Sequence, residues 1–413
     1  MFRRKRAKGT PPDPGRPTHP EHPDHPEHPD LPEHPDLPER PPNPPQESGS
    51  PEDPLDLRLG EHEEGPTHLG IDTILRMRDN LFDAERRLGP GHPDVLGLRH
   101  NYAFFLCVWS AAAPPGDTYM QDRAIPLFLV NLDHQTASLG PYARDTLLTL
   151  DGIGSAHLSA GRPTEALPYL RRALEGSELG PDRDEERILD RREKLSDAYA
   201  AAGDSDRATA LLEEALAGSR RILPPGGERL DARKQKLFSA YHKAGRPEAT
   251  ALCREIISDK ERFYGPDHLS TYIWVDNLAH LLHDARDLDG AIACYERVVR
   301  GFEQIHGADS DAISYRYHNL AIAHLEAGRP EVALPYLKAS LAAREHSRGL
   351  DDPGTLEALI SLISGYDQAG RLAEAIAATE RLIADLVRAG GPQHPKLPEV
   401  YAYLADLRRA GRG

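Results

Sequence analysis

Seven residues recur at a nearly fixed spacing along the chain and are the strongest candidates for binding chemistry. Each stands directly before an apolar residue in a helical pattern: Asn101, Gly152, Lys194, Lys236, Asn277, Asn319 and Ser361. An asparagine amide both donates and accepts hydrogen bonds, and a lysine ammonium donates to carboxylates. Because a helix interior does not favour asparagine intrinsically, three asparagines in one column indicate either a binding role or a bond to the neighbouring repeat.

Carboxylates occur beside this column, so its charge is mixed. Asp151, Asp190, Glu193 and Asp276 stand on the same predicted helices as the column residues. The two lysines of the column would favour an acidic segment or a terminal carboxylate, and these acids would oppose it.

A proline and histidine tract near the N-terminus has a second chemistry. Every third residue from Pro11 to Pro44 is proline, which matches the three residues per turn of a polyproline II helix, and His19, His22, His25, His28 and His34 fall on one of its edges. Imidazoles charge between about pH 5 and 7 and can bind Zn²⁺ or Ni²⁺. Their spacing of about 9 Å along the edge separates the ligands, so we expect an acidic spacer without a metal site.

No pattern typical of catalysis occurs in the sequence. There is no His-Glu-x-x-His, Cys-x-x-Cys or Gly-x-Ser-x-Gly, and Gly152-Ile153-Gly154 falls inside a helical pattern, not after a strand. His157 and His324 occupy a column that holds tyrosine in other repeats and are expected to pack in the core. His280 and His283 share a helix face, but the sequence places no cysteine or carboxylate beside them. We predict no catalytic residues, no metal site and no cofactor, and hence a protein that is not an enzyme.

A repeat of helix pairs positions the column. The small residue that opens each second helix falls at steps of 41 or 42, namely Ala124, Ala166, Ala208, Ala249, Ala291, Ala333 and Ala375. The turn before it reads Ala-Gly-Arg-Pro at 160, 244 and 327, where glycine supplies a left-handed residue, and Ala285-Arg286-Asp287 is the glycine-free variant. One such hairpin cannot bury its apolar stripe alone, so stacked copies and an all-α solenoid are predicted.

The segments GPDHLSTYIWVDNLAHLL (265–282) and YHNLAIAHLEAGRPEVALPYL (317–337) resemble the 42-residue tetratricopeptide repeat of kinesin light chains and their bacterial relatives. The resemblance implies a right-handed α-solenoid of helix hairpins whose first helices line a concave groove for an extended peptide. Amide side chains there can satisfy the peptide backbone. The peptide-binding residues implied are Asn101, Lys194, Lys236, Asn277 and Asn319. The middle repeats depart from the Asn-Leu-Ala pattern, and the first repeat carries an insertion around 111–118.

The chain of 413 residues divides into two predicted regions. Residues 1–66 read as a disordered basic tip followed by an acidic Pro/His-rich linker. Residues 67–413 read as the solenoid, with a cap helix over about 71–88, seven hairpins and a last cap helix over about 397–410.

Composition narrows the class of protein. The net charge is −16, which disfavours a general nucleic-acid binder. Three cysteines inside predicted helices indicate reduced thiols in a cytoplasm, and no apolar run reaches the ~18 residues of a membrane span. Abundant Arg, Ala, Gly and Pro suggest a GC-rich bacterial genome, such as that of an actinomycete.

These observations predict a non-enzymatic scaffold or adaptor that binds an extended peptide or partner protein. The alternative is a regulatory sensor that acts with a separate signalling partner. Its acidic N-terminal arm, including residues 45–66, would fold onto Lys194 and Lys236 and inhibit it.

Overall fold

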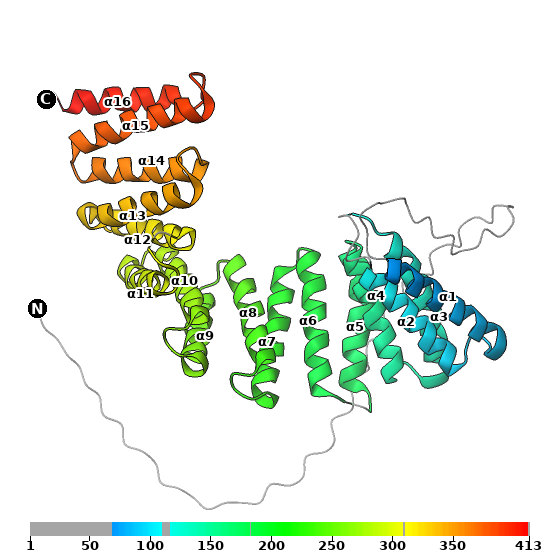
Figure 1. Cartoon of the computed structure of the whole chain (residues 1–413). Helices are drawn as coiled ribbons and strands as arrows, with labels where there is room; N and C mark the ends of the chain where they lie inside the picture. Colours follow the sequence, from blue (N-terminus) through cyan, green and yellow to red (C-terminus); the bar gives the residue numbers. More distant parts are fainter. Residues whose placement is uncertain (1–67, 110–115, 182, 309, 412–413) are drawn as a thin grey trace, which may run out of the picture. The chain divides into compact units, whose positions relative to one another are not determined.

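The computed structural model describes residues 68–109, 116–181, 183–308 and 310–411 (Figure 1). These ranges contain sixteen α-helices and no strand. The basic tip, the Pro/His-rich arm and most of the insertion in the first repeat lie outside the described residues.

The helices follow one another as a single helix, seven pairs and a final single helix. In the described part of the chain the first helix is α1 (His68–Leu88), which starts three residues earlier than predicted, and the last is α16 (Leu397–Ala410). The first helices of the pairs are α2 (Pro93–Trp109), α4 (Arg144–Ser159), α6 (Glu185–Ala201), α8 (Glu228–Lys243), α10 (Leu269–Asp284), α12 (Asp311–Glu326) and α14 (Pro353–Gln368). The second helices are α3 (Tyr119–Leu139), α5 (Pro163–Leu179), α7 (Ser205–Ile222), α9 (Glu248–Tyr264), α11 (Leu288–His306), α13 (Pro330–Arg348) and α15 (Leu372–Gly390).

Glycine ends most first helices as the turn sequences predict. Gly161 and Gly328 have φ of 69° and 71°, in the left-handed region that glycine adopts without strain. After Gly161, the N–H of Arg162 donates to the carbonyl oxygen of His157 at 2.9 Å, which closes the helix end. In the glycine-free turn Arg286 takes this place with φ of 63°, and within the described ranges it is the one non-glycine residue with positive φ.

The hydrophobic core runs along the array, between each helix and its neighbours in the chain. The seven alanines that open the second helices are all buried, which lets the two helices of each pair approach closely. Each helix packs mainly on its neighbours in the chain, and one continuous apolar cluster extends from Leu212 on α7 to Ala343 on α13. The predicted all-α solenoid is therefore confirmed. None of the described helices is both long enough and apolar enough to cross a membrane.

Candidate functional site

The column of seven residues runs along the first helices, and several of its members line open grooves. We call these residues, together with the solvent-exposed residues up to one turn before and after them on the same helices, the first-helix face. A groove of about 540 Å³ between α4, α6 and α8 contains Lys194 and Lys236, and a groove of about 300 Å³ between α12 and α14 contains Ser361. Part of this face therefore opens to solvent in hollows that a chain segment could occupy.

The groove between α4, α6 and α8 is almost entirely charged. Apart from Leu148, its lining consists of four bases and four acids: Arg187, Arg191, Lys194, Lys236, Asp151, Asp190, Glu193 and Asp197. The acids and bases are equal in number, so this groove carries no net charge.

A registered series of ion pairs connects neighbouring first helices. In each pair, the arginine stands three positions before one residue of the column. Its partner is the acid that stands one position before the column residue of the preceding repeat. Arg191 Nη2 lies 2.9 Å from Asp151 Oδ2, Arg316 Nη2 lies 3.4 Å from Asp276 Oδ2, and Arg233 pairs with Glu193.

Burial affects the charges in this series. Burial raises the pKa of the Asp276 carboxyl and lowers the pKa of the Arg316 guanidinium, and the attraction between the two groups opposes both effects. The sequence interpretation noted three of these acids as charges of the groove and missed their arginine partners. The recurrence of an arginine 40 residues after each acid is the sequence signal that places these pairs in register.

The two lysines of the column differ in their surroundings. Lys236 Nζ lies 2.8 Å from Asp197 and 3.9 Å from Glu193, so its charge is already balanced within the protein. Lys194 is exposed and forms no ion pair with any described residue. Of the two, Lys194 is the better placed to receive a carboxylate from a partner.

The three asparagines also differ. Asn319 Nδ2 lies 3.4 Å from His280 Nε2 on the preceding first helix, which is the bond to a neighbouring repeat that the sequence left open. Asn101 and Asn277 make no side-chain hydrogen bond to other residues in the described part of the chain. Their amides therefore keep their hydrogen-bonding capacity for a ligand or for water.

The two histidines on α10 have carboxylates nearby, so the sequence interpretation, which placed none beside them, was wrong. Asp276 stands four residues before His280 on the same helix, a spacing that puts both on one face. His280 Nε2 lies 3.9 Å from Asp276, and His283 Nε2 lies 3.4 Å from Glu326 on α12. The Nδ1 of His280 is also 3.0 Å from the hydroxyl of Tyr295. Across the described ranges, no group of three or more His, Cys, Asp and Glu side chains is arranged to hold a metal ion.

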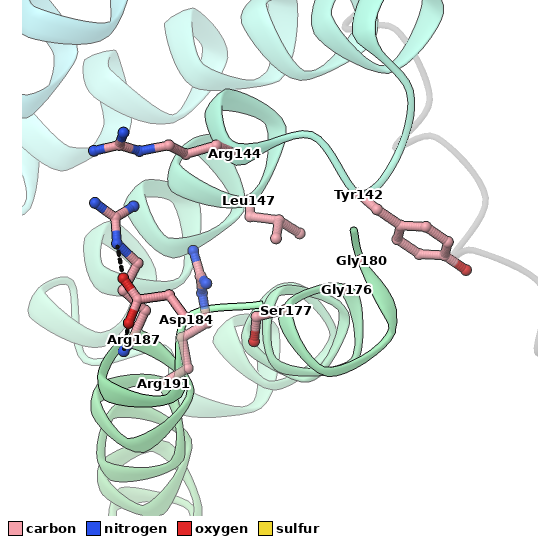
Figure 2. Close-up of a pocket in the computed structure, with 9 residues that line it drawn as sticks. All are labelled: Tyr142, Arg144, Leu147, Gly176, Ser177, Gly180, Asp184, Arg187 and Arg191. Atoms are coloured by element: carbon pink, nitrogen blue, oxygen red, sulfur yellow. Dashed lines mark hydrogen bonds and ion pairs between the residues drawn. The ribbon is translucent and has the colours of Figure 1, made fainter. Parts of the chain in front are cut away.

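A smaller cavity of about 210 Å³ lies where α4, α5 and α6 meet (Figure 2). Asp184 accepts from the N–H groups of Glu186 and Arg187 at the start of α6, and its carboxylate also lies 3.0 Å from Arg187 Nε. The hydroxyl of Ser177 donates to the carbonyl oxygen of Leu174. These groups satisfy one another, so the cavity is a feature of helix packing and capping.

Comparison with known proteins identifies the repeat. Two family models, both described as tetratricopeptide repeat, match the chain, one over residues 270–346 and 317–384 and the other over 146–179 and 188–226. These ranges contain most of α4–α7 and α10–α15. No curated protein matches the chain.

Solved structures with similar folds include three classes of protein. A kinesin light chain of Podosopora anserina with nearly identical TPR-like repeats has 21% identity and a TM-score of 0.43, covering 50% of this chain and 97% of that one. Aspartyl phosphate phosphatase F from Bacillus subtilis has 13% identity and a TM-score of 0.39, with coverage of 84% and 96%. The quorum sensor NprR from B. thuringiensis has 14% identity and a TM-score of 0.38, with coverage of 83% and 95%.

The family assignment rests on the two models and on the repeated hairpins, because the structural similarities are distant. Helix pairs recur every 41 or 42 residues through the described part of the chain, each with a buried alanine at the start of its second helix. The chain contains tetratricopeptide repeats, which the two family models match over most of α4–α7 and α10–α15.

Proposed function

We propose that this protein is a non-enzymatic scaffold that binds an extended segment of a partner protein along its first-helix face. The observation that carries the proposal is the row of exposed or half-buried polar groups that remain available there, above all Asn101, Lys194 and Asn277. An extended segment presents backbone N–H and C=O groups that need partners when they leave water, and side-chain amides supply both kinds.

The experiment is an affinity capture from the native cytoplasm followed by mass spectrometry. Wild type is compared with the variant Lys194→Ala/Asn277→Ala, which removes two available groups without cutting into the core. A matched control, Arg171→Ala/Arg254→Ala, removes two exposed side chains from the second helices α5 and α9. All three proteins are first shown to melt at the same temperature.

We expect the first-helix variant to lose a protein that wild type and the control both retain. Equal recovery of the same proteins by all three would contradict the proposal, because the available amide and ammonium groups would then make no contribution.

The alternative, a sensor inhibited by its own acidic arm, rests on residues outside the described ranges. Lys236, one of the two lysines to which the arm would bind, already pairs with Asp197, so the described residues lend this reading less support. It stays a prediction.

A further inference from the structure

Charge is distributed unevenly along the solenoid. Residues 140–243, which contain α4–α8, hold 18 acids and 17 bases, for a net charge of −1. Residues 265–368, which contain α10–α14, hold 16 acids and 8 bases, for a net charge of −8. Each span has 104 residues and contains three first helices, so the two net charges can be compared directly. The α10–α14 span is strongly negative, and the α4–α8 span is nearly neutral.

The first-helix face is also more apolar in the α10–α14 span than on α4, α6 and α8, where Leu148 is the one large apolar side chain that the described residues expose. On α10, α12 and α14 it exposes three large apolar side chains, since Ile273 is 45% exposed, Tyr315 is 48% exposed and Ile360 is 37% exposed. Ile273 and Tyr315 stand four residues before Asn277 and Asn319, and Ile360 directly precedes Ser361. Ile273 and Tyr315 thus recur in one register on neighbouring first helices, and Ile360 lies one turn further along α14. Exposed apolar residues grouped in this way mark an interaction surface better than scattered ones do.

The groove between α12 and α14 gives this surface depth. Its lining combines Ile322, Leu325 and Ile360 with the polar groups of Ser361, Ser364 and Gln368. Glu326, also in the lining, already pairs with His283 and Arg286. A hollow of about 300 Å³ with an apolar lining and a few polar groups suits a bulky aliphatic or aromatic side chain.

A free carboxylate stands beside the apolar residues. Glu357 on α14 occupies the register of Ile273 and Tyr315, is exposed, and forms no ion pair with any described residue. By contrast, Asp276 on α10 is buried against Arg316 and cannot present its charge outward. Glu357 is therefore the local charge that a bound segment would meet.

We propose that the α10–α14 portion of the first-helix face binds a protein segment in which bulky apolar side chains are flanked by lysine or arginine. The apolar side chains fill the hollow beside Ile360 and cover Tyr315, and the basic residues are attracted by Glu357 and by the −8 charge of this span. This inference rests on the proposed function and specifies which chemistry the partner brings to this part of the face.

The test uses the full chain and three labelled synthetic peptides of equal length, with binding measured by fluorescence anisotropy. The first peptide alternates leucine and phenylalanine with lysine, the second replaces its lysines by glutamate, and the third replaces its apolar residues by serine. The third peptide reports the attraction of cations to the acidic chain as a whole. Measurements at about 50 mM and about 300 mM NaCl separate the electrostatic part, because exposed charges are strongly screened at the higher concentration.

The protein variants locate the site. Tyr315→Ser/Ile360→Ser removes two exposed apolar side chains, and Glu357→Gln removes one charge. The matched control is Leu148→Ser on α4, which occupies the register of Ile273 and Tyr315 and is 37% exposed, but lies in the neutral span.

We expect the cationic apolar peptide to bind more tightly than the other two. Tyr315→Ser/Ile360→Ser should weaken its binding by about tenfold or more, and Leu148→Ser should change it by less than about twofold. Glu357→Gln should weaken it by about two- to threefold and flatten the dependence on salt.

Equal binding of the glutamate peptide, binding that Tyr315→Ser/Ile360→Ser leaves unchanged, or no binding of the cationic apolar peptide would each overturn the inference. Capture of a cellular partner that depends on Lys194 and Asn277 would then still support the scaffold. If that capture is independent of the first-helix face while the peptide behaves as expected, the proposed function fails and the peptide site stands.

Discussion

His324 on α12 shows how burial alone can give one residue a pH-dependent effect on stability. It fills the column that holds tyrosine at Tyr199, Tyr241 and Tyr366, is 4% exposed, and its ring stacks on that of Tyr336 with centroids 6.0 Å apart. Neither of its ring nitrogens has a hydrogen-bond partner in the described part of the chain. The sequence predicted a packing histidine here, and the burial and stacking agree with that interpretation.

Acid should destabilise the protein partly through this side chain. Burial lowers the pKa of His324 below 6.5, so the unfolded chain takes up its proton at a higher pH than the folded chain does. The stability that the neutral, buried His324 ring contributes is thus fully present above pH 6.5, and it is lost as pH falls through the lowered pKa of the folded state. We expect His324→Phe to lose less free energy of unfolding than wild type between about pH 7.5 and about pH 5, measured by chemical denaturation. His346→Phe, exposed on α13, is the control, and equal losses in wild type and His324→Phe would contradict the argument.

Single-residue roles on the first-helix face were only partly readable from the sequence. The spacing was enough to find the column, because it follows the repeat. It could not show that Lys236 is held by Asp197 while Lys194 is not, since both lysines stand in the same register. That difference depends on which side chains of the adjacent first helix come within reach, and therefore on how two repeats pack.

At the scale of the helix pair, the turn is the feature that the sequence predicted best, and one turn departs from the rule. Gly328 has φ of 71°, and a Cβ added there would meet no other atom within 4 Å. The advantage of glycine at this turn is therefore purely conformational. Arg286 adopts nearly the same φ of 63° with a side chain in place, which costs about 1 kcal/mol.

Replacing Arg286 by glycine should stabilise the protein. The substitution removes the unfavourable conformation but also the pair between Arg286 and Glu326, which is exposed and contributes about 0–1 kcal/mol. We expect Arg286→Gly to raise the free energy of unfolding by up to about 1 kcal/mol, and the reciprocal Gly328→Ala to lower it by about 1 kcal/mol. Thermal melts of both variants check this. Arg286→Ala removes the pair while keeping the left-handed backbone, so a stabilisation by alanine equal to that by glycine would show that the backbone is not the cause.

The helix pairs and their order could be predicted from the 42-residue recurrence, whereas the ion pairs between repeats were not predicted. Each hairpin needs only local information, namely an apolar period, a turn and a small residue at the close approach. Arg191 and Asp151 meet across 40 residues because successive first helices lie next to each other. The recurrence shows that such pairs are in register, but only the packed structure shows that the side chains face each other.

At the scale of the whole solenoid, stability should be divided among neighbouring helices. Helices in the described ranges pack mainly on the helix before and the helix after, so a defect at one end has no direct contact with the middle. In such an array the free energy is approximately a sum of repeat terms and nearest-neighbour interface terms. Loss of one interface should therefore loosen the adjacent helices and leave distant ones protected.

Two leucine truncations test this division. Leu404 on α16 is 6% exposed and Leu216 on α7 is 2% exposed, and replacing a buried leucine by alanine costs about 2–5 kcal/mol. We expect Leu404→Ala to speed amide hydrogen exchange in α15 and α16 while α4–α8 keep the protection of wild type. Leu216→Ala should speed exchange in α6–α8 and leave α15 and α16 unchanged. Uniform acceleration along the chain by either variant would mean that the solenoid opens as one cooperative unit, because a local defect would then be felt by helices that it does not touch.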